Sequence, residues 1–232
     1  MNARFTRSAL ATAGIVVGAA GAYSRWFVPW ERGWGATAAE REMPLAGDEF
    51  VDAPQYLTTR AITMDASPED LFPWLVQMGE GRGGLYSYDA LDQLFGFLDR
   101  PSSTEILEEW QHLQVGDEIP LGRGANFPVA ALEPNRWLVL AGGADGMAWS
   151  WAMVLEPTAD GRLRFITRNR VSGVGSRFAL AMVDLAAFIM VRRWLQVLKG
   201  RAEMTALARR APEADTEDRV AEPVLLGMRQ HR

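Results

Sequence analysis

Residues 147–171 read MAWSWAMVLEPTADGRLRFITRNRV, and their side chains alternate with a period of two residues. In the first half, large side chains occupy the odd positions and small ones the even positions, with Trp149 and Trp151 at the centre. In the second half, arginines alternate with apolar or small polar residues. Because successive side chains of a strand point to opposite faces, both halves predict β-strands, joined by a turn at 157–161.

Four more segments have strand-like sequences, and turn residues bound them. These turns are rich in Gly, Asn and Asp, as at 122–126 and 142–146. In chain order, the predicted strands are 56–64, 117–121, 127–132, 136–141, 147–155 and 162–171. Because short loops join the last five, we expect these five to pair as antiparallel neighbours.

Two short helices are predicted after the first strand. One begins with Ser67 as its cap and Pro68 at its first helical position. The other spans 87–95. Its apolar residues are expected to share one side: Leu91, Leu94 and Phe95.

Two further helices are predicted nearer the C-terminus. Ser102 and Glu105 have the spacing of a capping box, which indicates a helix start. Residues 177–210 lack proline and carry apolar residues at steps of three and four, which predicts one long helix. A sheet with one apolar face must bury that face, and a helix of this length can cover it. We therefore predict an α+β fold, a curved antiparallel β-sheet wrapped around a long C-terminal α-helix.

The N-terminal segment has the character of a membrane anchor. The run Ser8–Tyr23 carries no charge, but its 16 residues span only about 24 Å as a helix. Continuing past Arg25 gives a helix long enough to cross a bilayer, with Trp26 and Trp30 as an interfacial belt. Pro29 is expected to end this helix.

Two alternatives to the anchor remain open at this point. The small residues at 20–22 form a possible cleavage site of a signal peptide, and an ordinary buried helix is the third interpretation. The predicted organisation is an anchor or signal at 1–30, a tether at 31–53, a ligand-binding domain at 54–210 and a flexible tail at 211–232. Gly14 and Gly18 form a GxxxG pair, which permits weak self-association as well as simple filling of the apolar run.

Composition excludes several classes of function. A net charge of -5 argues against binding of nucleic acid through summed positive charge. The chain has no Cys and only two His, so thiolate chemistry, disulfides and histidine-built metal centres are not expected. We predict no metal, no cofactor and no catalytic residue, and this composition favours binding over catalysis.

The two faces of the central strands each allow two interpretations. The large residues around Trp149 and Trp151 could fill the core under the long helix or line a pocket for an apolar ligand. The arginines of 162–170 could form a solvated outer face, or Arg168 could bind an anionic group of a ligand.

The stretches Trp74–Gly79 and Gly84–Asp92, together with Val115–Leu121, resemble a bacterial, membrane-anchored branch of the SRPBCC superfamily. These are START-like, birch-pollen-allergen-like helix-grip proteins. The resemblance covers residues 31–206 and implies a helix-grip fold with a hydrophobic cavity between sheet and helix. It also implies binding of lipids, sterols, polyketides or hormones, whereas this branch supplies no established reaction.

These observations lead to three hypotheses. The first is membrane-tethered binding or transport of a hydrophobic small molecule, such as a lipid, an isoprenoid or a polyketide-like compound, with residues 8–30 in the membrane. Its predicted ligand-binding residues are Trp74, Gln77, Tyr86, Tyr88, Asp89, Trp149, Trp151, Phe165 and Arg168.

The second hypothesis is a polyketide cyclase- or aromatase-like enzyme acting in the same cavity. It would polarise a carbonyl with Tyr86, Tyr88 or Arg168 and move protons with Asp89 or Asp92. The third is an interaction module with a filled core, expected if no cavity of about 300 Å³ exists.

Overall fold

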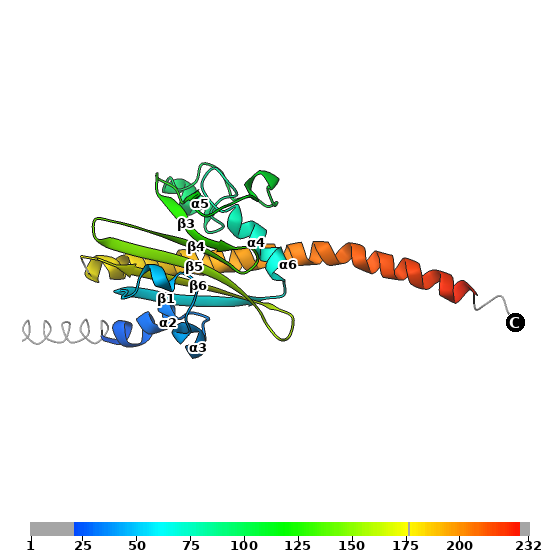
Figure 1. The fold of residues 1–232 in the computed structure, drawn as a ribbon, viewed down its shortest axis with the longest axis horizontal. Coiled ribbons are helices and arrows are strands. Elements are labelled where there is room, and N and C mark those ends of the chain that lie inside the picture. The colour runs from blue at the N-terminus through cyan, green and yellow to red at the C-terminus, as the bar shows by residue number, and fades with distance from the viewer. Residues whose placement is uncertain (1–20, 176, 228–232) are drawn as a thin grey trace, which may run out of the picture.

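The computed structural model describes residues 21–175 and 177–227, with the side chains of all of these except 177–183 and 212–227. One antiparallel sheet in the order β1-β6-β5-β4-β3-β2 forms the centre of the molecule, and the long helix α6 (Arg177–Gly227) crosses one of its faces (Figure 1). The predicted α+β architecture, a sheet gripping a C-terminal helix, is confirmed.

All six predicted strands form, with boundaries within three residues of those expected. Their bounds are β1 Tyr56–Met64, β2 Glu118–Pro120, β3 Asn126–Glu133, β4 Trp137–Ala144, β5 Met147–Pro157 and β6 Leu163–Ser172. Trp151 lies opposite Leu140 on β4 and Asn169 on β6, so the register follows the alternation of the sequence.

The inner face of the sheet packs on α6. Met153 and Phe165 from the sheet meet Trp194, Leu195 and other apolar residues of the helix in one buried core. The helix α4 (Pro68–Val76) packs against the same helix, and Trp74 donates a hydrogen bond from Nε1 to Thr205 Oγ1 at 3.1 Å. The N-terminus of α4 has a capping box, made by Ser67 and Asp70.

The segment between α4 and β2 differs from expectation. The short helix α5 (Asp89–Leu94) forms, but the helix predicted after Ser102 does not, and only a 3-10 turn, η3 (Glu108–Trp110), follows. The Ser102 hydroxyl donates to Asp89 Oδ1 and accepts from the Tyr86 backbone N–H. Because these contacts occupy the hydroxyl, Ser102 does not cap a helix.

The segment 31–53, predicted as a tether, instead packs against the sheet. Its elements are α2 (Val28–Arg32), α3 (Ala38–Glu42) and η2 (Asp48–Phe50), drawn below the sheet in Figure 1. The Ala61 N–H on the edge strand β1 donates to the Trp34 carbonyl at 3.1 Å, so the segment covers that edge. Leu45 contributes to a second buried cluster on the outer face of the sheet.

The arginines of β6 hold this segment and are not a solvated face. Arg164 donates to both carboxylate oxygens of Glu40 at 2.7 and 2.8 Å. Arg168 is only 3% exposed, and Arg170 contacts Asp48 at 3.1 Å. The prediction of a solvated outer face is therefore wrong, because residues about 120 positions earlier in the chain cover these arginines.

A helix runs from residue 21 to Arg32, and Pro29 does not end it. The turn before the proline is a π-helix, η1 (Tyr23–Phe27), and this wider turn accommodates a residue that lacks an N–H. None of the helices in the described part of the chain is long and apolar enough to cross a membrane. Most of the predicted anchor, together with Gly14 and Gly18, lies outside the described residues.

At the other end, α6 continues beyond the predicted boundary at Arg210 and runs to Gly227. Figure 1 shows this part of the helix extending past the edge of the sheet. The predicted tail at 211–232 is thus helical in its backbone as far as residue 227.

Candidate functional site: an apolar cleft beside helix α6

A cleft of about 240 Å³ lies between the inner face of the sheet, α6 and the segment around α5. Its walls are apolar except for Ser87 and Asp92. The residues that line it are Met78, Leu85, Ser87, Asp92, Phe97, Leu121, Trp151, Met190, Val191 and Trp194. The cleft is therefore suited to a hydrophobic molecule with a small polar part.

Two tryptophans from different elements form one wall of the cleft. Trp151 comes from β5 and Trp194 from α6, and their ring centroids lie 5.2 Å apart at an angle of 56°. The Trp151 indole donates from Nε1 to Thr167 Oγ1 at 2.7 Å, which fixes the orientation of the ring. With its N–H satisfied by the protein, this indole presents mainly apolar surface.

Asp92 supplies the carboxyl group of the cleft. The residue is only 1% exposed to solvent. One oxygen of its side chain, Oδ2, accepts a hydrogen bond from the Ser87 hydroxyl. Burial raises the pKa of Asp92, the nearby Asp89 raises it further, and the hydrogen bond from Ser87 acts in the opposite direction. The carboxyl is therefore more easily protonated than an exposed aspartate.

The orientation of α5 explains how Asp92 becomes buried. The sequence predicts that Leu91, Leu94 and Phe95 share one side of this helix, and all three are exposed, Leu94 to 74%. The helix instead turns its acidic residue inward. The backbone carbonyl of Asp92 accepts hydrogen bonds from the N–H groups of Phe97 and Leu98. These bonds close the loop after α5 beside the cleft.

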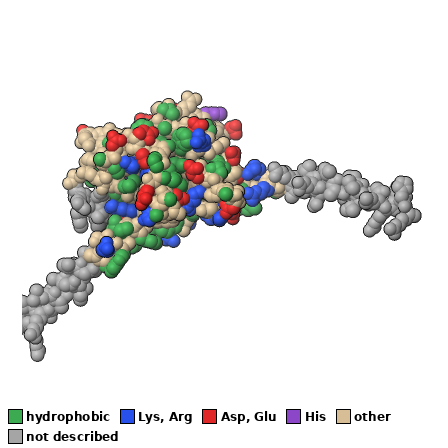
Figure 2. Space-filling model, turned by 60° about the horizontal axis from the view of Figure 1, so that its bottom comes forward, with side chains coloured by type: hydrophobic (Ala, Val, Ile, Leu, Met, Phe, Trp, Pro, Cys, Tyr) green, Lys and Arg blue, Asp and Glu red, His purple; other side chains and the backbone are tan. Residues whose placement is uncertain are grey.

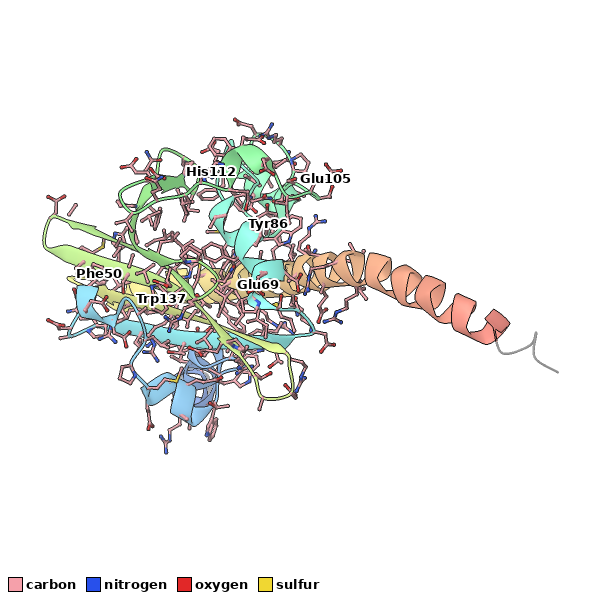
Figure 3. All side chains as sticks on the ribbon, turned by 45° about the vertical axis from the view of Figure 1, so that its right-hand side comes forward. Phe50, Glu69, Tyr86, Glu105, His112 and Trp137 are labelled. Carbon is pink, nitrogen blue, oxygen red and sulfur yellow. The ribbon has the colours of Figure 1, made fainter. Side chains whose placement is uncertain are left out.

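Gln77 and Tyr86, predicted to orient a ligand, are occupied by the protein. Gln77 donates from Nε2 to the Tyr86 hydroxyl at 2.5 Å and to the Glu105 carbonyl at 3.1 Å. Its Oε1 accepts from the Leu107 N–H at 2.8 Å and from Gln111 at 3.2 Å. Figure 3 shows Tyr86 between α4 and the loop that carries Glu105. This pair therefore fastens a loop and does not line the cleft.

Three predicted aromatic residues belong to the packed core. Trp74 and Tyr86 make an edge-to-face contact with ring centroids 5.8 Å apart. Phe165 is fully buried against Trp194. Trp149 is half-buried and contacts Phe127, with ring centroids 4.6 Å apart. None of them is among the residues that line the cleft.

The remaining predicted site residues also lie away from the cleft. Asp89 accepts hydrogen bonds from the N–H and hydroxyl of Ser102 at 3.0 and 2.7 Å. Tyr88 is exposed, with the Arg193 guanidinium 5.6 Å from its ring centroid. Arg168 lies on the outer face, across the sheet from the cleft. Of the nine predicted ligand-binding residues, Trp151 alone lines the cleft.

Some of the lining could have been recognised from the sequence. Val191 and Trp194 are three residues apart on the long helix, as expected for residues on its buried side. Asp92 was predicted as a proton carrier only for the cyclase-like enzyme, and it was not among the predicted ligand-binding residues. Nothing in the local pattern distinguishes Ser87 from an ordinary loop residue.

Comparison with known proteins gives structural neighbours only. No family model matches the chain, and no curated protein matches it. DynU16, from the dynemicin biosynthetic locus, matches with 14% identity and a TM-score of 0.38 over 63% of this chain and 48% of its own. The chain thus spans about half the length of DynU16.

Two further neighbours match over most of their length. The protein jhp0584 from Helicobacter pylori has 14% identity and a TM-score of 0.44, over 69% of this chain and 96% of its own. CalU16 from Micromonospora echinospora has 12% identity and a TM-score of 0.34, over 65% and 86%. Likenesses this distant say nothing about ligand or reaction. The sheet order and α6 themselves establish that the chain has a helix-grip fold.

Proposed function

We propose that this protein binds a small hydrophobic molecule in the cleft between the sheet and α6. The observation that carries the proposal is an apolar cleft walled by Trp151 and Trp194 and containing a buried carboxyl, Asp92. Pockets for small molecules typically combine such walls with a few polar groups that fix orientation.

The size of the cleft indicates the size of the ligand. Its volume of about 240 Å³ exceeds the roughly 150 Å³ of an engineered apolar cavity that binds benzene. It is smaller than the roughly 300–1,000 Å³ typical of pockets for drug-sized molecules. It is also below the roughly 300 Å³ under which an interaction module with a filled core is expected, and the binding titration distinguishes that hypothesis from ligand binding. A molecule of one or two rings, or one end of a longer lipid, fits this volume.

The experiment is a binding titration of the purified full-length chain. Naphthalene serves as an uncharged two-ring probe, and binding is followed by tryptophan fluorescence and calorimetry. Met190→Trp should fill the cleft and weaken binding at least tenfold. Met204→Trp is the matched control, because Met204 lies on the same helix, is exposed and does not line the cleft.

The outcomes separate clearly. Saturable binding that Met190→Trp weakens and Met204→Trp preserves supports the proposal. Absence of binding to naphthalene, or equal binding by both variants, contradicts it. Native mass spectrometry of the freshly purified protein gives a second readout, since a hydrophobic ligand from the host should add a discrete mass.

A second candidate function is acid–base catalysis of the cyclase type, favoured by the buried carboxyl of Asp92. Such an enzyme needs an acid and a polar donor that converge on the substrate. Only Ser87 accompanies Asp92 in the cleft, while Tyr86, Tyr88 and Arg168 lie elsewhere. Asp92→Asn should abolish turnover of a linear poly-β-ketone, measured by mass spectrometry, while preserving binding. Binding without turnover by the wild type excludes this candidate.

Membrane attachment through residues 8–30, as in the membrane-anchored SRPBCC branch, is part of the proposal. Its supports are the uncharged run that precedes Arg25 and the exposure of Trp26 and Trp30. Figure 2 shows apolar side chains at the surface where the described chain begins. The full-length chain should remain in a carbonate-washed membrane pellet. A mature chain that begins at Tyr23 would instead indicate a cleaved signal.

A further inference from the structure

The single carboxyl in the cleft has an unusual set of neighbours. Asp92 is buried, and Ser87 Oγ is the donor to its Oδ2 within the part of the chain that the structure describes. No described Lys or Arg forms an ion pair with it, and the charged group that acts on its pKa is another carboxylate, Asp89. An ionised carboxylate in such a place is costly, because burial removes most of its hydration and no described cation compensates for it.

The positions of the hydrogens on Ser87 and Asp92 determine which hydrogen bond the cleft can donate to a ligand. The Ser87 hydroxyl has one hydrogen, which it donates to Asp92 Oδ2. When Asp92 is protonated, Oδ1 carries the remaining hydrogen, and no described group accepts it. A ligand in the cleft can therefore accept a hydrogen bond from this carboxyl, while the rest of its surface meets apolar walls.

We infer that Asp92 selects ligands whose polar group is an uncharged hydrogen-bond acceptor, such as a ketone, and discriminates against carboxylates and ammonium ions. This inference rests on the proposed binding of a hydrophobic molecule. A carboxylate ligand loses its hydration between apolar walls and brings its negative charge near that of Asp89. An ammonium group brings three donors into a cleft that offers acceptors only at Ser87 and Asp92, so it leaves donors unpaired.

The test compares four probes with the same ring system on the full-length protein. These are naphthalene, 2-acetylnaphthalene, 2-naphthoate and 2-naphthylmethylamine. We expect the ketone to bind about tenfold more tightly than naphthalene, as one additional hydrogen bond provides. The carboxylate should bind at least tenfold more weakly than the ketone, and so should the ammonium probe.

Two variants at position 92 assign this preference to the carboxyl. Asp92→Asn keeps a donor in the same place and should preserve the preference for the ketone. Asp92→Leu removes the donor and should reduce the difference between ketone and naphthalene to less than twofold. Gln93→Leu is the control for a leucine on the same helix, because Gln93 is exposed.

The ranking of the four probes on the wild type suffices even if a variant fails to fold. Tightest binding of the carboxylate or of the ammonium probe overturns the inference, and so does a ketone preference that Asp92→Leu retains. If naphthalene binds but the ranking fails, the inference alone is wrong. If no probe binds, the proposed function is wrong as well.

Discussion

Asp48 and Arg168 lie 120 residues apart in the chain, and their side chains form an ion pair of 2.7 Å on the outer face of the sheet. Arg168 also donates to Thr59 Oγ1 and to the carbonyls of Met43, Glu40 and Arg41. One buried guanidinium thus holds much of the segment 40–48. This segment is consequently an integral layer of the domain.

Replacing Arg168 should destabilise the fold strongly. Arg168→Leu removes the buried donor to the carbonyls of Met43, Glu40 and Arg41 and one of the two guanidinium groups that contact Asp48, so we expect a loss of about 3 kcal/mol. Urea denaturation followed by circular dichroism measures it. Arg162→Leu is the matched control directly before the same strand, because Arg162 pairs with Asp160 in solvent and should contribute little. Equal effects of the two variants would contradict this account of the outer face.

Glu31→Gln should stabilise the protein at alkaline pH. Burial, and then the negative charge of Asp184, raise the pKa of Glu31 to about 7, while Arg60 and Arg32 act in the opposite direction. Because the folded-state pKa exceeds the unfolded value, the contribution of Glu31 to stability is most favourable below about pH 4.5 and is lost as pH rises through 7.

The glutamine variant lacks this titration. At pH 8 it should be more stable than the wild type by about 2 kcal/mol, and near pH 5 the difference should be much smaller. Thermal unfolding at both pH values tests this. A constant difference between the two would show that Glu31 does not titrate in this range.

Glu40→Gln should show the opposite dependence. Hydrogen bonds from Arg164 lower the pKa of Glu40 to about 2, despite the opposing effect of burial. Glu40 therefore stabilises the fold above about pH 4.5, and this contribution is lost as pH falls toward 2. Its variant should be less stable than the wild type at pH 7 and similar to it near pH 2.5, in the same unfolding assay.

Gly35→Ala should weaken the packing of segment 31–53 against the edge strand β1. Gly35 has a φ of +74°, and a Cβ at this position would lie 2.0 Å from the Ala61 carbonyl oxygen. Gly96→Ala separates backbone strain from the clash, because Gly96 has a similar φ of +71° and open space around it. We expect about 1 kcal/mol for Gly96→Ala and clearly more for Gly35→Ala, measured by urea denaturation.

Gln77→Leu should affect stability without affecting the ligand. It leaves the Tyr86 hydroxyl without its Gln77 donor and the Leu107 N–H without its acceptor, and it removes one of the two donors to the Glu105 carbonyl, which should cost about 2–3 kcal/mol. Because Gln77 does not line the cleft, naphthalene affinity of the folded variant should stay within twofold of the wild type. A tenfold loss of affinity with unchanged stability would instead restore Gln77 as a ligand-binding residue.

The fold was far more predictable than the site. Strands and the long helix follow from side-chain periodicity, which is local, so β1 and β5 begin where the alternation begins. Trp151 lies at the cleft because a strand turns alternate residues toward the same face. Gln77 and Tyr86 were predicted to orient a ligand by hydrogen bonds, and Arg168 to bind an anionic group of it. Their partners proved to be distant segments of the same chain.

By itself, the sequence determined the order of elements, the antiparallel meander and the absence of cysteine. Only the tertiary structure decided that Asp92 faces the cleft while Leu91, Leu94 and Phe95 face solvent. It also decided that segment 31–53 covers the outer face. The physical reason is that periodicity defines which residues share a face. Which face is buried depends on contacts between residues far apart in the chain.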